Sequence, residues 1–164
     1  LCDGVILHSF NTPQYTRDVV LPNLQKGAER VGRSIEDITI SGGGFIVAGK
    51  NEEELEKKRK ETKTRISFYA STRSYGDVMR TQGWNDTHEK LYRMSIDGKW
   101  NQMGDEITDE MLDSFAVIGT YDQIAGKIKS TYGKYATSVS FGMDTQNEEE
   151  ENILRDVIKN LKGS

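Results

Sequence analysis

Short apolar segments of the kind that form strands alternate along this chain with longer segments that have helical periodicity. The strand-like segments are residues 5–10, 38–48 and 138–141, and the helical segments are residues 12–32, 51–70, 120–133 and 148–162. Repeated alternation of strand and helix predicts parallel strands that are joined by right-handed crossovers. We therefore expect an α/β fold.

Three parallel strands would leave two sheet edges without a neighbour. Parallel sheets are normally covered on both faces, and open edges invite pairing with further strands. The chain also begins with Leu1 and no initiator methionine, directly ahead of the first strand. We therefore expect that the missing strands come from a preceding segment of a larger barrel or from a second chain.

Composition restricts the classes of partner. The chain has 164 residues, of which 35% are hydrophobic and 29% charged, as in a soluble globular domain. A net charge of −4 provides no basic field for nucleic acid or for an anionic membrane surface. Apolar runs such as residues 5–7 and 45–48 are far too short to span a bilayer, and no signal-peptide pattern is present. These features favour a cytoplasmic protein that binds neither nucleic acid nor membrane.

The residues that usually bind metals are sparse. Cys2 is the single cysteine, so an internal disulfide is impossible, and the histidines His8 and His88 have no cysteine or histidine around them at metal-ligand spacing. We expect no metal site and assign no role to Cys2.

The first helix carries clear boundary signals and one internal break. Thr12 is a good N-cap, Pro13 suits the first helical position, and Gly32 is a natural C-terminal stop. Pro22 lies inside the pattern and removes a backbone hydrogen bond. We therefore predict a kink or break at residues 18–21.

Three consecutive glycines, residues 42–44, interrupt the second strand-like segment. They could form a phosphate cradle, but a strand pattern and not a helix N-terminus follows them. A bulge or a close approach of two backbones is the better interpretation.

The rest of the chain divides into a helical middle and a final unit. Asn51 caps a long helix that ends near Ala70, and a string of short helical pieces then runs to residue 115. Thr120 and Gln123 resemble a capping box. We predict one partial domain in which residues 1–70 form two strand–helix units, residues 71–116 a helical insertion, and residues 117–164 a final helix, strand and helix.

Polar residues that follow the strands are the first candidates for a site, because catalytic groups of parallel barrels lie at the carboxyl ends of the strands. These residues are His8, Ser9 and Asn11 after the first strand, and Asp144 after the third. His8 could orient a substrate or donate a proton, or it could simply form a hydrogen bond with the following loop.

Aromatic residues crowd the irregular middle of the chain: Phe68, Tyr69, Tyr75, Trp84, Tyr92 and Trp100. Such a cluster can form the wall of a pocket for a planar ring or an acyl chain, or it can pack in the core. Core packing is the expectation for most of them. Tyr69 and Tyr75, which flank the break between two helices, are the candidates for a pocket.

Three segments carry a resemblance to a known family. Residues 3–8 (DGVILH), 68–75 (FYASTRSY) and 115–120 (FAVIGT) look like the luciferase-like monooxygenase family, especially its deazaflavin-dependent oxidoreductase branch. Their order and spacing match, as does the turn at residues 32–34. The resemblance covers nearly the whole chain but corresponds to the C-terminal half of the family. It implies a partial (β/α)8 TIM-type barrel, with about the last three strand–helix units and a helical insertion.

The resemblance also implies redox chemistry on a small-molecule substrate. In this family a flavin (FMN) or a deazaflavin reacts at the carboxyl ends of the strands, and the protein positions it. Much of the cofactor-binding apparatus belongs to the N-terminal half, so no catalytic residue is transferred here. The matching positions His8, Tyr69 and Tyr75 become candidates for residues near the substrate or the cofactor.

Three hypotheses follow. In the first, the chain is the C-terminal part of a flavin- or deazaflavin-dependent oxidoreductase and is inactive alone, with weak or absent cofactor binding. In the second, it is a non-catalytic half-barrel that pairs with a second copy of itself as a structural or binding protein. In the third, a separate N-terminal subunit completes the barrel.

Overall fold

The computed structural model describes residues 2–141, 145 and 147–163. The described strands form two short parallel ladders. Their bounds are β1 (Gly4–Ile6), β2 (Thr39–Ser41), β3 (Phe45–Gly49) and β4 (Ala116–Thr120). Strand β1 pairs with β2, and β3 pairs with β4, in both cases parallel. The expected α/β fold with parallel strands is confirmed.

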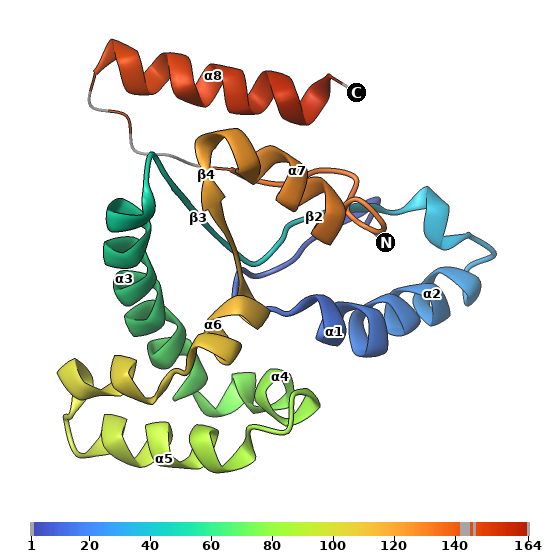
Figure 1. Ribbon diagram of the computed structural model, residues 1–164. Coiled ribbons are helices and arrows are strands. Elements are labelled where there is room, and N and C mark those ends of the chain that lie inside the picture. The colour runs from blue at the N-terminus through green and yellow to red at the C-terminus, as the bar shows by residue number, and fades with distance from the viewer. Residues whose placement is uncertain (1, 142–144, 146, 164) are drawn as a thin grey trace.

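Helices connect these strands and account for most of the chain. The first part contains α1 (Pro13–Tyr15), η1 (Thr16–Val20), α2 (Leu21–Glu29), η2 (Ile35–Asp37) and α3 (Glu52–Ala70). The middle contains η3 (Arg73–Tyr75), α4 (Gly76–Thr81), α5 (Asn85–Ile96), η4 (Trp100–Glu106) and α6 (Asp109–Phe115). The last are α7 (Tyr121–Tyr132) and α8 (Glu148–Lys162). Figure 1 shows α4, α5 and α6 gathered beside one end of α3, with α8 against α7 at the opposite end of the molecule.

The first ladder has shorter strands than the sequence predicts, and it lacks the expected third strand. The expected strand at residues 5–10 ends at Ile6, although the N–H of Leu7 still donates to the carbonyl of Ser41 at 2.8 Å. The expected third strand at residues 138–141 is wrong as a strand, because only Ser138 forms a bridge, parallel to Ser41. The segment nevertheless lies beside β2, since the N–H of Thr137 donates to the carbonyl of Ile40 at 2.8 Å.

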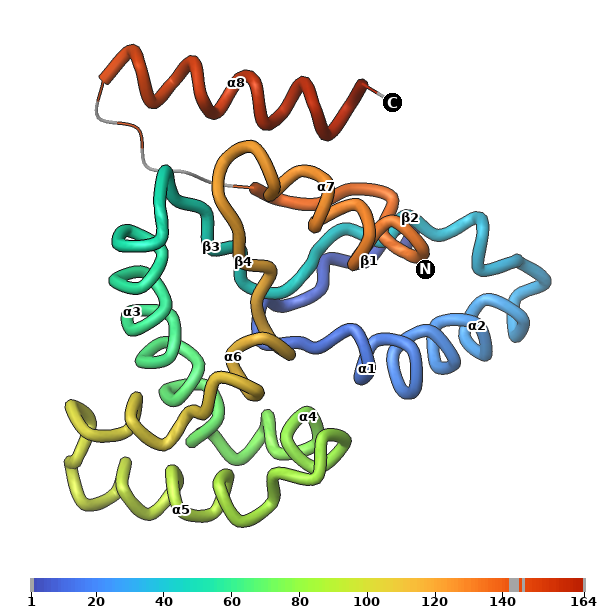
Figure 2. Tube along the Cα trace, in the orientation of Figure 1, coloured from blue at the N-terminus to red at the C-terminus, as the bar shows by residue number. Residues whose placement is uncertain are grey.

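The second ladder corrects two expectations. Residues 38–48 do not form one strand, because the chain leaves β2 at the three glycines and continues as β3 in the other ladder, as Figure 2 traces. Residues 116–120 form β4, for which no strand was predicted. Its first four residues are all buried, so the segment lacks the alternation that marks a half-exposed strand.

The helical segment after β1 behaves as predicted. The hydroxyl of Thr12 accepts a hydrogen bond from the N–H of Tyr15 at 3.1 Å and caps the helix. The expected break ahead of Pro22 is a π-helical turn, η1, in which the N–H of Leu21 donates to the carbonyl of Thr16. Gly32 follows with φ +71°, a conformation that favours glycine and ends the helical path.

Two apolar clusters form the core. One lies between β3, α3 and the middle helices, and the other between β4, α7 and α8. The predicted insertion supplies much of the first cluster through side chains that are almost fully buried: Met79, Leu91, Met103 and Leu112. The middle helices therefore form part of one core with α3.

The C-terminal helices also match their predicted bounds. Helix α8 begins and ends as predicted, and Val157 is its most buried residue. Thr120 is the N-cap residue of α7, but its side chain makes no capping hydrogen bond, so the predicted capping box is wrong. Within residues 2–141, 145 and 147–163, none of the helices has the length and apolar character that a bilayer crossing requires.

Candidate functional site

His8 lies just beyond the carboxyl end of β1 and is exposed. Its Nδ1 accepts a hydrogen bond from the N–H of Phe10 at 3.0 Å, which is the loop contact that the sequence allowed. Because Nδ1 is the acceptor, the neutral ring carries its proton on Nε2. His8 can therefore offer an N–H donor at the strand end while its other nitrogen fixes the orientation of the ring.

Two tyrosines from a distant part of the chain surround this imidazole. The ring centroid of Tyr69 lies 4.9 Å from that of His8 in an edge contact, and the ring of Tyr75 stacks on His8 at 5.2 Å. The two tyrosines also contact each other, with centroids 5.8 Å apart. The structure thus brings together the three residues that the sequence singled out, and both phenol rings are partly exposed.

Buried aromatic rings of the core lie behind His8, Tyr69 and Tyr75. Phe10 stacks on Phe115 with centroids 4.5 Å apart, and it touches both Tyr69 and Tyr75. Phe45, the first residue of β3, lies 6.3 Å from Tyr69. The exposed faces of His8 and the tyrosines therefore rest on rigid, buried rings, which limits their movement.

His88 holds the turn that carries the two tyrosines, and sequence reasoning missed this role. The side chain is 4% exposed, and its Nδ1 lies 2.6 Å from the carbonyl oxygen of Ala70. A carbonyl only accepts, so Nδ1 donates. Its Nε2 faces Gly76, where an added Cβ would lie 2.9 Å away. The spacing of His88 within a helical pattern was the only available signal, and it does not reveal a partner 18 residues away.

The other residues predicted at strand ends have different environments. The side chain of Asn11 is buried, and its amide donates to the hydroxyl of Thr16 at 2.8 Å, so Asn11 braces the start of the first helix. Its Oδ1 has no hydrogen-bond partner in the described part of the chain. The carbonyl of Ser9 accepts from the N–H of Asn11 in a tight turn. Asp144 lies outside the described residues.

The expected core packing of the remaining aromatic residues is only partly correct. Trp84 packs against Phe115, with centroids 5.9 Å apart. The guanidinium of Arg73 lies over Tyr92 at 3.9 Å. Phe68 and Trp100, however, are 53% and 47% exposed. The core expectation is wrong for these two residues, because they lie on the outer face of α3 and η4.

The three glycines serve close packing and do not cradle a phosphate. The N–H of Gly44 donates to the phenol oxygen of Tyr132 at 2.7 Å. A Cβ on Gly44 would lie 2.1 Å from the carbonyl oxygen of Phe115, and one on Gly43 would lie 2.9 Å from the ring of Tyr132. Protein atoms therefore occupy the space that a phosphate would need, and the expected close approach is confirmed.

A polar cluster lies where β3 ends, but it is bonded to the backbone. The ammonium of Lys58 donates to the carbonyl of Ala48 at 2.6 Å and pairs with Glu54 at 2.6 Å. The N–H of Lys50, and then Lys58, hold the pKa of Glu54 below its usual value. Burial raises the pKa of the neighbouring Tyr121. These contacts tie the end of the ladder to α3.

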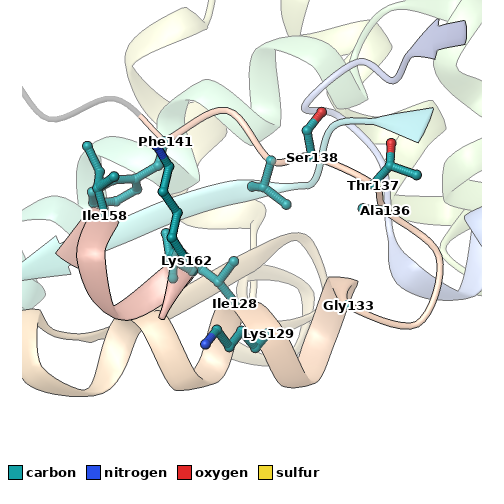
Figure 3. Close-up of a pocket in the computed structure, with 11 residues that line it drawn as sticks. Ile128, Lys129, Gly133, Ala136, Thr137, Ser138, Phe141, Ile158 and Lys162 are labelled. Carbon is teal, nitrogen blue, oxygen red and sulfur yellow. The ribbon is translucent and has the colours of Figure 1, made fainter. Parts of the chain in front are cut away.

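A separate apolar cavity of about 480 Å³ lies between α7, α8 and residues 136–141. Figure 3 shows Ile128 and Ile158 from the two helices lining it together with Phe141. The polar side chains that line it are Lys129, Thr137, Ser138 and Lys162, and neither His8, Tyr69 nor Tyr75 is among the lining residues. Among the residues that the structure describes, no group of three His, Cys, Asp or Glu side chains could hold a metal ion.

The parallel ladders, their helices and the aromatic cluster beyond β1 define a segment of an α/β barrel with a candidate site at a strand end. The model of the luciferase-like monooxygenase family matches residues 1–138, and the chain belongs to that family. The resemblance seen in the sequence is thereby confirmed.

Several proteins are similar to this chain in sequence. An uncharacterised protein of Mycobacterium tuberculosis is 36% identical over 130 residues, which are 79% of this chain and 38% of that protein. The 5,10-methylenetetrahydromethanopterin reductase of Methanopyrus kandleri is 23% identical over 144 residues, or 87% of this chain and 39% of that protein. The enzyme of the same name from Archaeoglobus fulgidus is 23% identical over 171 aligned residues, which cover 99% of this chain and 49% of that protein.

A solved structure agrees with the sequence relatives. The coenzyme F420 dependent tetrahydromethanopterin reductase from Methanopyrus kandleri superimposes with a TM-score of 0.70 and 22% identity, covering 93% of this chain and 43% of that chain. The expected partial TIM-type barrel is therefore confirmed. The chain spans between 38% and 49% of the length of the curated relatives it matches.

Proposed function

We propose that this chain is the C-terminal portion of a flavin- or deazaflavin-dependent oxidoreductase. The carrying observation is that His8 presents its Nε2 side just beyond the end of β1, with Tyr69 and Tyr75 holding the ring. Strand ends are where parallel barrels place their chemistry. Membership of the luciferase-like monooxygenase family supports a redox reaction, and the coenzyme F420 dependence of the Methanopyrus kandleri reductase favours a deazaflavin.

The residues present fit one side of such a cofactor or its substrate. A planar ring needs flat apolar contacts and a few placed donors, which Tyr69, Tyr75 and the Nε2–H of His8 supply. The glycines at residues 42–44 do not fit a phosphate, because Tyr132 and Phe115 occupy that space. The phosphate-bearing part of a cofactor would need residues beyond this chain.

A bound flavin or deazaflavin supplies hydride transfer, which the side chains of the chain cannot perform. His8 would donate a hydrogen bond from Nε2 to an oxygen of the bound molecule and hold that oxygen in place. The two tyrosine rings would exclude water from the same side. Their partial burial against Phe10 fixes these positions before binding.

The remaining wall of the site would come from the rest of the barrel, carried by a preceding segment of the same protein or by a second chain. The supporting fact is that the chain spans 38% to 49% of the length of its curated relatives. With so much contact surface missing, the chain alone would bind FMN or a 5-deazaflavin more weakly than about 100 µM and would be inactive.

Reconstitution tests this function. The chain is titrated with FMN and with a 5-deazaflavin by fluorescence, alone and after mixing with the amino-terminal part of the Mycobacterium tuberculosis relative. With an added electron acceptor in the absence of oxygen, we expect cofactor binding and accelerated transfer of electrons from the reduced cofactor to that acceptor only in the mixture. This turnover should be lost with His8→Ala but not with the exposed-site control Cys2→Ser. Micromolar binding with turnover by the chain alone would show a complete site, and a mixture that binds neither cofactor would refute the oxidoreductase.

A second candidate is a half-barrel that self-associates as a structural or binding protein. Within the described residues β1 pairs on one side only, and Ile6 at its end is 84% exposed. An open parallel edge with an exposed apolar side chain can pair with a second copy. Light scattering would then show a dimer that Ile6→Lys dissociates, whereas a well-folded monomer contradicts this candidate.

A further inference from the structure

We propose that the substrate is a planar aromatic or similarly apolar anion, and that Arg65, Phe68 and Trp100 bind it beside Tyr69. This inference rests on the proposed function in that it names the substrate class of the same site. Arg65 would hold the carboxylate or an equivalent anionic group, and the two exposed rings would hold the apolar body.

The aromatic contacts run without interruption from His8 to this surface. The centroid of Tyr69 lies 4.9 Å from that of His8, and the ring of Phe68 lies 5.4 Å from Tyr69. Trp100 of η4 follows, 6.1 Å from Phe68. The ring contacts therefore form a chain from His8 through Tyr69 to Phe68 and Trp100, and these last two rings are open to solvent, since they are 53% and 47% exposed.

Arg65 adds a positive charge to the same face of α3. It precedes Phe68 by three residues and Tyr69 by four, so the three side chains are neighbours on the helix surface. Its guanidinium lies 5.3 Å from the ring centroid of Phe45, the buried ring next to Tyr69. Stacking on an aromatic ring orients a guanidinium and leaves its edge donors available.

Arg65 forms no ion pair within the described residues. Arg59 and Lys63, on the same helix, pair with Asp113 at 3.5 Å and Asp109 at 2.8 Å. Glu61 lies one turn ahead of Arg65, the favourable orientation for a helix ion pair, yet the two form none. No carboxylate among the described residues pairs with Arg65.

The unpaired guanidinium of Arg65 and the exposed rings of Phe68 and Trp100 together favour one chemical class of ligand. Arginine binds carboxylates through paired N–H donors, and exposed aromatic faces bind flat apolar groups. Lys99, the cation next to Trp100, is occupied by Asp97 at 3.0 Å. One available cation beside two open rings therefore fits a ligand with a single anionic group on an apolar body.

Two matched fluorescent probes test this proposal on the chain alone. 1-Anilinonaphthalene-8-sulfonate is a planar aromatic anion, and N-phenyl-1-naphthylamine is its neutral counterpart. Arg65→Gln is expected to weaken the anionic probe about tenfold, which corresponds to about 1.4 kcal/mol, and the neutral probe less than twofold. Phe68→Ala is expected to weaken both probes, and the control Lys60→Gln, which removes an exposed cation of the same helix, neither.

The outcomes separate this inference from the proposed function. An unchanged affinity of the anionic probe in Arg65→Gln would overturn the inference, as would loss of that binding in Phe141→Ala, a residue that lines the apolar cavity between α7 and α8. Circular dichroism of each variant shows that the fold is intact. No cofactor is present in this assay, so its result is independent of the reconstitution. A failed reconstitution would refute the oxidoreductase but not the anion site, and a failed probe experiment would refute the anion site but not the oxidoreductase.

Discussion

The imidazole of His8 stacks on the phenol ring of Tyr75, with ring centroids 5.2 Å apart and planes inclined by 28°. His8 follows β1, and Tyr75 ends the turn after α3, so the contact joins two parts of the chain that are far apart in sequence. This pair is the centre of the candidate site, because Tyr69 and Phe10 both touch it.

Replacing the stacked ring should release His8. In Tyr75→Leu the apolar bulk remains but the ring contacts with His8 and Phe10 are lost, at a cost of about 0.5–1.5 kcal/mol in the free energy of unfolding. The ring-proton resonances of His8 should move downfield in the NMR spectrum as the ring current disappears. Tyr75→Phe keeps the ring and should leave both quantities unchanged, and an unshifted His8 in the leucine variant would contradict the stacking.

Removing His88 should loosen the turn that carries Tyr69 and Tyr75. The buried ring donates to the carbonyl of Ala70, so His88→Ala should lower the free energy of unfolding by about 2 kcal/mol. Hydrogen exchange of the amides at residues 71–75 should become faster. His8→Ala removes two ring contacts of an exposed side chain and should cost less, about 0.5–1 kcal/mol. Equal effects of the two substitutions would argue against the anchoring role.

Tyr132 should make the fold sensitive to high pH. Burial raises the pKa of Tyr132 to about 12, whereas an unfolded tyrosine ionises near pH 10. The unfolded chain therefore loses its proton first, and this contribution to stability, complete below pH 10, declines as pH rises toward 12. Between pH 9 and pH 11 the decline amounts to ~1.3 kcal/mol.

Tyr132→Phe is the matched variant for that measurement. Urea unfolding at pH 7 should show a loss of about 1 kcal/mol, because the N–H of Gly44 loses its acceptor. From pH 9 to pH 11 the variant should lose less stability than the native chain. Parallel declines of the two proteins would mean that Tyr132 does not retain its proton.

Gly44 should tolerate no side chain. A Cβ there would lie 2.1 Å from the carbonyl oxygen of Phe115, so Gly44→Ala should destabilise the chain by more than about 3 kcal/mol. Gly126 in α7 has no atom within 4 Å of an added Cβ, and Gly126→Ala should stabilise the chain by about 0.5–1 kcal/mol. Chemical unfolding of both variants checks the contrast, and similar losses would contradict the close packing at Gly44.

Much of the helical structure was predictable from local pattern. Asn51 caps α3 through a hydrogen bond from the N–H of Glu54 at 3.0 Å, and α3 and α8 end where the periodicity ends. The break ahead of Pro22 was also predictable, because proline removes a hydrogen bond from its own helix. Each of these features depends on residues within a few positions of one another.

The sequence by itself determined the alternation of strand and helix, the caps and the family, and it singled out His8, Tyr69 and Tyr75. Only the tertiary structure decided that the chain changes ladders at residues 42–44, that residues 116–120 form a strand, and that His88 anchors the tyrosines. The physical reason is the range of the interactions. Strand pairing, ring stacking and the contacts of a buried histidine join residues far apart along the chain, which local periodicity does not specify.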